Sequence, residues 1–383
     1  MTQCPVVSVN GDFAGPKALG PEWYRAWQGG RHEVSRHVQD CTFCQLCEAA
    51  CPVGVPVAHL IMEHKARAAS QVGSRERLRD AILARPHWVG RWSRVSRVPA
   101  VVRRFGRLSV SVRFPKRRWS RVPDLGEPLA PPRGTVGLFQ DCYSQAYDPE
   151  LVAMARALLR LWGYTVIPVP QRLTCCGAAA SAAGRPALAT SLARRLWPEL
   201  NEALSGCEAL VTLNATCDGT LREEWPLYAD LSLSRPVQPF DVIAAEAPPI
   251  FWERLESVGS GDGVWVTHTT CRGKVARGDG HLTVLALRAG YQTVVPADAA
   301  CCGAGGSYAF KAEHEATSEA LVAALKRQVA EEGSVQGIMT DSGTCALHIE
   351  DATGVATRHP AYWLYQRYGQ YLTKKEAGDH ERT

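Results

Sequence analysis

Four cysteines stand close together early in the chain, at positions Cys41, Cys44, Cys47 and Cys51, with Pro52 directly after the last. This C-x2-C-x2-C-x3-C-P spacing is typical of bacterial ferredoxin-type [4Fe–4S] sites. The two short steps let one tight turn aim three thiolates at three corners of a cube, and the proline then turns the chain away. Zinc motifs usually consist of two separated C-x2-C pairs instead. The spacing therefore predicts an iron–sulfur cluster, which is a carrier of electrons.

A further cysteine, Cys4, stands far upstream of this motif. In two-cluster ferredoxin modules, the fourth cysteine of one motif ligates the cluster of the other motif. By that logic Cys4 completes the site of the first three motif cysteines, and Cys51 serves a second cluster whose other three cysteines are absent. The natural start would then lie upstream of Met1, or that other cluster has been lost. Two simpler interpretations stay open, in which Cys4 is a mobile terminal thiol and Cys51 is a structural cysteine.

Two Cys-Cys-Gly units occur later in the chain, each with further cysteines on either side. Adjacent cysteines cannot easily form a disulfide with each other, but both can donate to one metal cluster if the glycine allows an unusual backbone turn. The alternative is a pair of buried apolar cysteines beside a Gly/Ala-rich turn. The first candidate four-thiolate set is Cys142, Cys175, Cys176 and Cys217, and the second is Cys271, Cys301, Cys302 and Cys345. Cys207 has no counterpart in the second half, so we expect a buried, inert thiol there.

The elements that position these cysteines repeat along the chain. Matching cysteines of the two sets are 129, 126, 126 and 128 residues apart, which indicates two copies of one unit. Each key cysteine follows a short β-branched run or lies in the adjoining loop, and open α/β sheets bind their ligands beyond the carboxyl ends of the strands. We therefore expect a mixed α+β and α/β fold. Its parts are a helical ferredoxin-type domain (1–70), a basic connector (71–133), a first Cys-Cys-Gly domain (134–245), a second Cys-Cys-Gly domain (246–372) and a frayed tail (373–383).

The composition is that of an ordinary soluble globular protein, with 46% hydrophobic and 21% charged residues in a chain of 383. The N-terminus has no basic region followed by an apolar core, so we expect no secretory signal. Thiols that stay inside the cell remain reduced, and their clustering then favours metal over disulfides. No apolar run is long enough to span a bilayer. A P-loop, a dinucleotide fingerprint and a nucleophile elbow are all missing, so we expect the chain to bind neither NAD nor FAD.

The connector carries an unusual concentration of positive charge. Residues 81–123 contain twelve Lys or Arg and no Asp or Glu, with aromatic residues interleaved. Such a segment suits an amphipathic helix lying on anionic lipid, and this is the interpretation we favour. A docking surface for an acidic partner subunit and a solvated linker are the alternatives. Nucleic acid would attract the same charges, but no recognition fold accompanies them, so we expect no nucleic-acid partner.

These features together resemble the iron–sulfur subunits of the heterodisulfide-reductase-related family. Within it, the likeness is greatest to the iron–sulfur subunits of anaerobic glycerol-3-phosphate dehydrogenases, with those of glycolate oxidases close behind. The resemblance covers nearly the whole chain and rests on Cys4-Pro5-Val6, the run from Cys41 to Pro52, Cys301-Cys302-Gly303-Ala304-Gly305-Gly306, and Cys345 ahead of His359-Pro360. It implies a ferredoxin domain followed by two Cys-Cys-Gly domains, beside a flavoprotein subunit that oxidises the substrate.

The resemblance implies the electron-transfer subunit, rather than the substrate-oxidising subunit, of a membrane-associated, flavin-dependent dehydrogenase of the glycerol-3-phosphate or 2-hydroxy acid type. Its cofactors would be at least one [4Fe–4S] cluster and further iron–sulfur clusters in the Cys-Cys-Gly domains, and its electrons would go to membrane quinone. We expect it in the cytoplasm, peripheral on the cytoplasmic face of the membrane. The alternative is a heterodisulfide-reductase-like enzyme acting on a thiol or disulfide. Asn214 and Ser342 weigh against that alternative, because relatives often have the first cysteine of a C-x2-C pair at these places.

Overall fold

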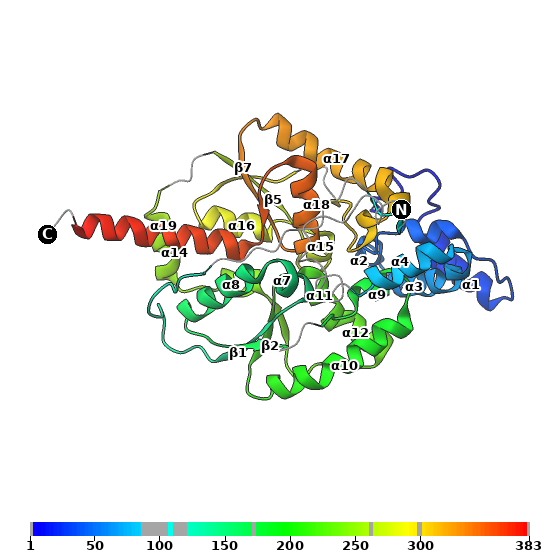
Figure 1. Cartoon of the computed structure of the whole chain (residues 1–383), viewed down its shortest axis with the longest axis horizontal. Helices are drawn as coiled ribbons and strands as arrows, with labels where there is room; N and C mark the ends of the chain where they lie inside the picture. The colour runs from blue at the N-terminus through cyan, green and yellow to red at the C-terminus, as the bar shows by residue number, and fades with distance from the viewer. Residues whose placement is uncertain are drawn as a thin grey trace.

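The computed structural model describes residues 3–85, 106–109, 121–170, 174–259, 263–296 and 301–380. A helical N-terminal segment lies at one end of the molecule, and two α/β units lie beside it, one above the other in Figure 1. The segment for which we predict membrane contact, residues 81–123, lies largely outside the described ranges.

The N-terminal segment is helical, as the sequence predicts. On the longest of its helices, α3, Val57 and Ile61 are one turn apart and therefore share a face. They pack with Val6, Phe13 and Leu19 in a small core that fixes the segment. Its elements are η1 (Ala18–Glu22), α1 (Trp23–Gln28), η2 (Arg36–Asp40), α2 (Leu46–Ala49), α3 (Val57–Ala68), η3 (Ala69–Gln71) and α4 (Ser74–Leu83).

The first α/β unit has a sheet of four parallel strands in the order β2-β1-β3-β4. Parallel neighbours need crossover connections, which here are mostly helical. The strands are β1 (Thr135–Phe139), β2 (Thr165–Val169), β3 (Ala209–Thr212) and β4 (Val237–Pro239). The helices are α7 (Cys142–Tyr147), α8 (Pro149–Leu161), α9 (Ala178–Ala182), α10 (Pro186–Leu204), α11 (Ala215–Gly219), η4 (Thr220–Glu224), α12 (Trp225–Ala229), α13 (Phe240–Ala245) and α14 (Pro249–Glu256).

The second unit has the same topology, with parallel strands in the order β6-β5-β7-β8. The predicted duplication of an α/β unit is therefore confirmed. The strands are β5 (Val264–His268), β6 (Gln292–Val294), β7 (Val335–Thr340) and β8 (Thr357–Arg358). The helices are α15 (Cys271–Arg277), α16 (His281–Arg288), η5 (Tyr308–Phe310), η6 (Ala312–His314), α17 (Glu315–Glu331), α18 (Gly343–Thr353) and α19 (Pro360–His380).

Helix α8 illustrates how the local sequence determines an element. Asp148 caps it by accepting a hydrogen bond from the backbone N–H of Leu151, and Pro149 starts it, where a missing N–H costs nothing. Leu151, Met154 and Leu158 then recur at helical spacing and are buried. This face belongs to the largest hydrophobic core of the described residues, which both units share.

Aromatic side chains join the two units within that core. The rings of Trp162 and Phe251 meet edge to face with centroids 5.3 Å apart, and Phe251 stacks on Tyr368 of α19 at 5.5 Å. Trp265 of β5 meets Trp363 of α19 at 4.4 Å. Because one hydrophobic core crosses the boundary between the units, the two units pack against each other and are not independent domains joined by a linker.

The predicted frayed tail is wrong for most of its length. Instead of ending near residue 372, α19 continues to His380 and projects from the body of the molecule (Figure 1). Lys374 donates a hydrogen bond to the backbone carbonyl of Ser257, 2.9 Å away. Helix propagation is easier than nucleation, so good helix formers such as Lys and Glu extend a helix that packing has already started.

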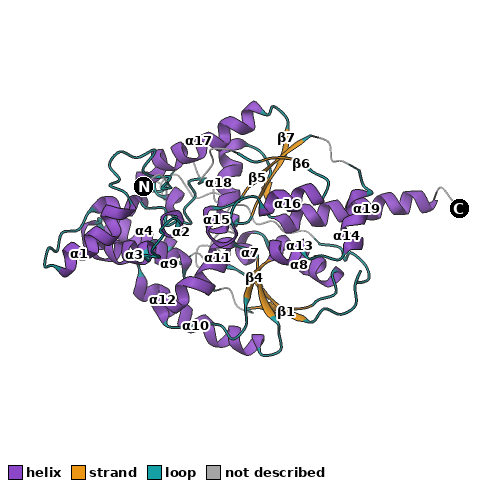
Figure 2. Ribbon diagram, turned by 180° about the vertical axis from the view of Figure 1, so that it is seen from behind, coloured by secondary structure: helices purple, strands orange, loops and turns teal. Residues whose placement is uncertain are grey.

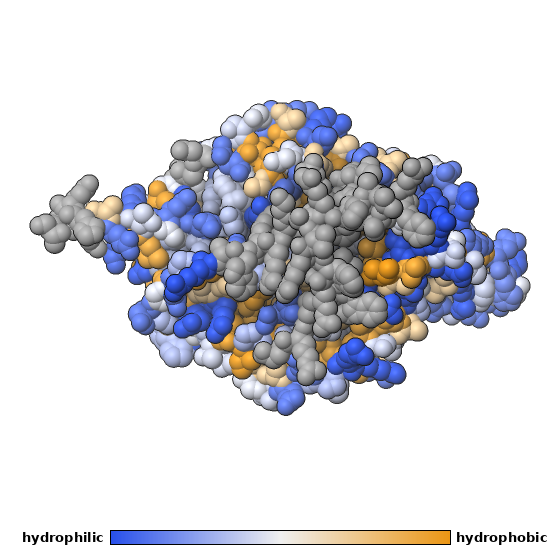
Figure 3. Space-filling view, in the orientation of Figure 1, coloured by the Kyte–Doolittle hydropathy of each residue, from blue (hydrophilic) through white to orange (hydrophobic). Residues whose placement is uncertain are grey.

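The helices lie outside the two sheets (Figure 2), and the exposed surface carries both apolar and hydrophilic residues (Figure 3). Helices surround the strands of each sheet in Figure 2. The face in Figure 3 shows apolar patches separated by hydrophilic residues. Within the described ranges, no helix is both long enough and apolar enough to cross a membrane.

Candidate cluster sites around a central cavity

The N-terminal candidate site is a small cavity lined by Cys4, Cys41, Cys44 and Cys47. Phe43 and Gln45 have φ values of 59° and 64°, so the chain turns sharply between the three motif cysteines. The backbone N–H of Phe43 lies 3.4 Å from the Sγ atom of Cys41 and donates to it. Apolar side chains, among them Val6, Phe13 and Ile61, complete the lining.

Cys51 lies outside this cavity although it belongs to the same motif. It is partly exposed, and its Sγ atom accepts a hydrogen bond from the backbone N–H of Val55 at 3.4 Å. Hydrogen bonds from the backbone at Val55 and Val53 lower the pKa of this thiol. Val53 beside it is 79% exposed. The structure thus brings Cys4 to the first three motif cysteines and leaves Cys51 at the surface.

The first Cys-Cys-Gly set lies beyond the carboxyl ends of its strands. Cys142 is the first residue of α7, after the cap Asp141, which accepts hydrogen bonds from the N–H groups of Tyr143 and Ser144. Cys176 comes from the loop after β2, and its Sγ atom lies 3.4 Å from that of Cys217 in α11. The carbonyl of Cys176 accepts a hydrogen bond from the buried indole of Trp225 at 2.8 Å.

The second set repeats this arrangement. Cys271 is the first residue of α15, after the cap Thr270, and Cys345 lies in α18. Side-chain hydrogen bonds join Cys271 to Cys301 and Cys345 to Cys302. All eight cysteines of the two sets are buried or half-buried thiols.

The two glycines of the Cys-Cys-Gly units need their special backbone. Gly177 has φ +100° and Gly303 has φ +80°, a region that residues with a side chain rarely adopt. A Cβ atom on Gly303 would lie 2.4 Å from the carbonyl oxygen of Ser318, and one on Gly177 would lie 3.2 Å from that of Ala189. At both positions the N–H donates to the first cysteine of its pair at 3.4 Å. The turn therefore requires glycine, as the sequence indicates.

Asn214 and Ser342 occupy corresponding places in the two units. Each is the residue before a helix that carries a candidate ligand, α11 with Cys217 and α18 with Cys345. The Asn214 side chain caps its helix by accepting a hydrogen bond from the N–H of Thr216 at 3.1 Å. These two departures from the C-x2-C pattern therefore lie at helix starts, where Asn and Ser are favoured.

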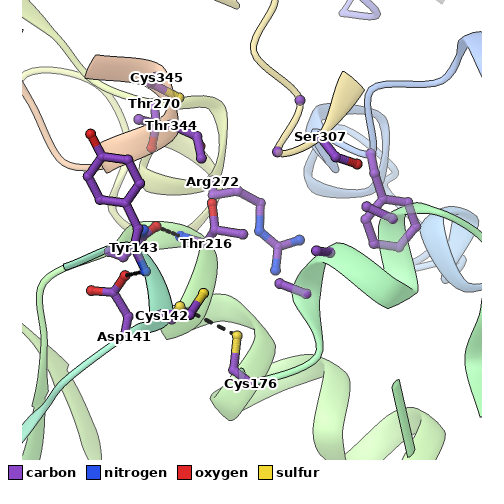
Figure 4. A pocket seen from close by; sticks show the side chains of 18 of the residues that line it. Asp141, Cys142, Tyr143, Cys176, Thr216, Thr270, Arg272, Ser307, Thr344 and Cys345 are labelled. Atoms are coloured by element: carbon purple, nitrogen blue, oxygen red, sulfur yellow. Dashed lines mark hydrogen bonds between the residues drawn. The ribbon is translucent and has the colours of Figure 1, made fainter. Parts of the chain in front are cut away.

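Both Cys-Cys-Gly sets meet at one central cavity of about 150 Å³. The first unit contributes all four of its cysteines to the lining, and the second contributes Cys271 and Cys345. Figure 4 shows residues of both units around this space. Thr42 and Phe43 line this cavity and also the N-terminal one, so they form a shared wall. The three candidate sites are therefore adjacent.

The pKa shifts of the cysteine thiols also show that the three candidate sites lie close together. Burial, followed by repulsion from Cys41 and Cys4, raises the pKa of Cys47 to about 12. Burial, followed by repulsion from Cys271, raises the pKa of Cys44, and α2 packs against α15. A hydrogen bond to Cys175, together with burial, raises the pKa of Cys142. Such thiols stay protonated until a metal displaces the proton.

The donor chemistry fits iron–sulfur clusters better than a single metal ion. In the part of the chain that the structure describes, no three His, Cys, Asp or Glu side chains converge on one ion position. A cubane cluster needs a wider arrangement of ligands, because each thiolate binds a separate iron atom at one corner of the cluster. Four-thiolate sets, mainly apolar linings and backbone N–H groups that donate to sulfur suit such a cluster.

Cys207 does not join any of these sites. It is 3% exposed, packs in the core of the first unit, and lies 3.3 Å from the carbonyl oxygen of Ala203, to which its thiol donates. The thiol is thus buried in the core, as expected.

Two charged residues of the site were not anticipated from the sequence. Arg272 of α15 and Glu224 of η4 both line the central cavity, and Nη2 of the arginine lies 2.5 Å from Oε1 of the glutamate. Neither residue lies in a sequence motif that indicates a functional role. The only sequence signal is that Arg272 directly follows the candidate ligand Cys271.

Comparison with known proteins defines the class of this protein. The cysteine-rich (CCG) domain family matches residues 136–222 and 265–350. The chain therefore carries the cysteine-rich domain twice.

The whole chain is also similar to two named proteins of Escherichia coli strain K12. One is the C subunit of anaerobic glycerol-3-phosphate dehydrogenase, 27% identical over 406 residues, with 95% of each chain covered. The other is the glycolate oxidase iron-sulfur subunit, 27% identical over 383 residues, with 93% of this chain and 89% of the relative covered. The resemblance inferred from the cysteine motifs is confirmed.

Proposed function

We propose that this chain is the iron–sulfur electron-transfer subunit of a flavin-dependent dehydrogenase and relays electrons from a flavoprotein partner towards membrane quinone. The observation that carries the proposal is the shared wall of Thr42 and Phe43, which separates the N-terminal four-cysteine cavity from the central one. A bound cluster supplies one-electron chemistry. The residues of the chain hold three such sites at adjacent positions within mainly apolar linings.

Several contacts of the chain keep these sites in place. The buried ammonium of Lys65 donates hydrogen bonds to the carbonyl of Cys41 at 2.7 Å and to that of Ala182 at 2.8 Å. It thereby ties the N-terminal cysteine turn to α9 of the first unit. A Cβ atom on Gly184 would lie 2.3 Å from Cβ of Lys65, so the glycine allows this close approach. Rigid spacing of this kind suits electron transfer, which needs little movement of the protein.

The similarity to a dehydrogenase subunit and to an iron-sulfur subunit supports a flavoprotein partner and an oxidation of glycerol 3-phosphate or a 2-hydroxy acid by the complex. We propose quinone as the acceptor and the basic segment 81–123 as the membrane contact on the cytoplasmic face. The N-terminal site would hold a [4Fe–4S] cluster. Each of the two Cys-Cys-Gly sites would hold one further iron–sulfur cluster.

The experiment is an anaerobic count of transferable electrons. The purified protein is reduced, freed of reductant and mixed with a soluble short-chain quinone, and the quinol formed per chain is measured. We expect quinol in the wild type and about one electron fewer per chain in Cys44→Ser, because that variant loses one cluster. Cys207→Ser is the matched control and should transfer as many electrons as the wild type.

Two results would contradict the proposal. A protein without iron, or one whose reduced form does not react with quinone, is not such a relay. A reduced protein that reacts with oxidised glutathione but not with quinone would instead support the heterodisulfide-reductase-like alternative. In that case thiol or disulfide chemistry at the central cavity would be the function.

A further inference from the structure

Arg272 carries a buried positive charge into the central cavity. The side chain is only 6% exposed and extends from the second unit into the space between the units (Figure 4). Its Nη1 atom is buried and has no hydrogen-bond partner among the described residues. A buried guanidinium nitrogen without a hydrogen-bond acceptor is costly, so an acceptor bound in the cavity would stabilise it.

The structure makes room for this side chain. A Cβ atom on Gly219 would lie 2.6 Å from Nη2 of Arg272, so the absence of a side chain there lets the guanidinium reach the first unit. Gly219 ends α11, the helix that carries Cys217. Arg272 itself directly follows Cys271. One guanidinium therefore touches the helix that carries Cys217 and belongs to the residue next to Cys271, and all three residues line the central cavity.

Glu224 pairs with the Nη2 atom of Arg272 but not with its Nη1 atom. Its Oε1 atom accepts from Nη2 of Arg272 at 2.5 Å and from the Gln45 amide at 3.4 Å, and its Oε2 atom accepts from the Ser181 hydroxyl at 2.9 Å. These partners come from the N-terminal segment and from both units. Both carboxylate oxygens of Glu224 thus accept hydrogen bonds, and neither of those bonds comes from Nη1 of Arg272.

We propose that Arg272 is the counter-charge of the Cys-Cys-Gly clusters and sets their reduction potentials, with Glu224 as the opposing charge. This inference rests on the proposed function, because it requires clusters in those sites. A cluster held by four thiolates is negatively charged and gains a further negative charge on reduction. A fixed positive charge in a low-dielectric cavity therefore favours the reduced form, and a fixed negative charge disfavours it.

The two charges give opposite predictions, which separates electrostatics from damage to the fold. Arg272→Gln should lower the midpoint potential of the Cys-Cys-Gly clusters by about 59 mV or more, a tenfold change in a one-electron equilibrium. Glu224→Gln keeps the shape of the side chain and should raise that potential. Arg272→Lys keeps the charge and should stay closer to the wild type than Arg272→Gln does. Arg254→Gln removes an equal charge next to Tyr368, away from the cavity, and should leave the potential unchanged.

The measurement is an anaerobic redox titration followed by EPR, with iron and sulfide counted in each variant. Shifts of opposite sign in Arg272→Gln and Glu224→Gln, at wild-type iron content, support the inference. Unchanged potentials, or shifts in the same direction, overturn it while the proposed function stands. If Arg272→Gln fails to retain iron, the titration of Glu224→Gln alone decides the question. A higher midpoint potential in that variant supports the inference, and an unchanged potential overturns it. A wild-type protein without iron overturns the proposed function and this inference together.

Discussion

The Nε atom of Arg277 lies 3.0 Å from Oδ2 of Asp241, so an arginine of the second unit pairs with an aspartate of the first. The same guanidinium reaches Asp341 at 2.8 Å and Asp218 at 3.7 Å. All three carboxylates are at most 4% exposed. Arg277 therefore contacts three buried carboxylates where the two units meet, with His281 beside Asp241 and Asp341 and Arg222 beside Asp218.

Removal of that cation should weaken the contact between the units. We expect Arg277→Met to lower the free energy of unfolding by about 3–5 kcal/mol, because it removes a cation that three buried carboxylates share. Arg160→Met is the control, since its 3.7 Å pair with Asp124 is exposed and should contribute less than about 1 kcal/mol. Anaerobic urea denaturation measures both. Equal losses in the two variants would contradict the role assigned to Arg277.

The same network predicts a dependence of stability on pH. Burial alone lowers the pKa of His281, but hydrogen bonds to Asp241 and Asp341 outweigh it and raise the pKa to about 9. Because the ordinary value is 6.5, the stabilisation is fully present below pH 6.5 and is lost as the pH rises through 9. Its size is on the order of 3 kcal/mol. His359 nearby has a pKa of about 4, lowered by burial, and does not titrate in this range.

The difference in stability between the wild type and His281→Gln isolates this effect. It should be largest at about pH 6 and should shrink towards zero by about pH 10, as measured by anaerobic thermal unfolding at several pH values. A difference that stays constant over the range would show that His281 is not protonated in the folded protein at neutral pH.

The Cys-Cys-Gly turn provides a test of backbone geometry. Gly303→Ala places a side chain at φ +80° and 2.4 Å from a carbonyl oxygen, so we expect a loss of about 1–3 kcal/mol from backbone strain and reduced iron content. Gly206→Ala is the control, because nothing lies within 4 Å of the added Cβ. Iron analysis and thermal unfolding check both variants. Full iron content in Gly303→Ala would mean that the turn tolerates the change or that it does not shape a cluster site.

The N-terminal cavity predicts which cysteine completes its site. Cys4→Ser should abolish or strongly alter the EPR signal of the N-terminal cluster, because Cys4 lines the cavity with Cys41, Cys44 and Cys47. Cys51→Ser should leave that signal intact, since its thiol lies outside. The opposite pattern would mean that the four cysteines of the motif bind the cluster together.

The sequence was informative where the pattern was local or repeated. The constant offset between the cysteine sets predicted two copies of one α/β unit, and both sheets have the same strand order. The glycine after each cysteine pair predicted a special backbone, and both glycines have positive φ. These features depend on neighbouring residues, so a single sequence can show them.

Other features depend on long-range packing and could not be predicted. Nothing in the local sequence indicates that Gln45, Ser181 and Arg272 share the carboxylate of Glu224. The extension of α19 to His380 depends on the core that starts the helix, so a polar run alone gave the wrong prediction of a tail.

The measurement that tests the central claim most directly is the content of iron and sulfide in the anaerobically purified protein, combined with EPR of its oxidised and reduced forms. We predict about eight or more irons per chain, with one signal lost in Cys44→Ser and a different one lost in Cys176→Ser or Cys302→Ser. About four irons, with a single signal that only Cys44→Ser removes, would contradict the claim, because the Cys-Cys-Gly sites would then hold no cluster.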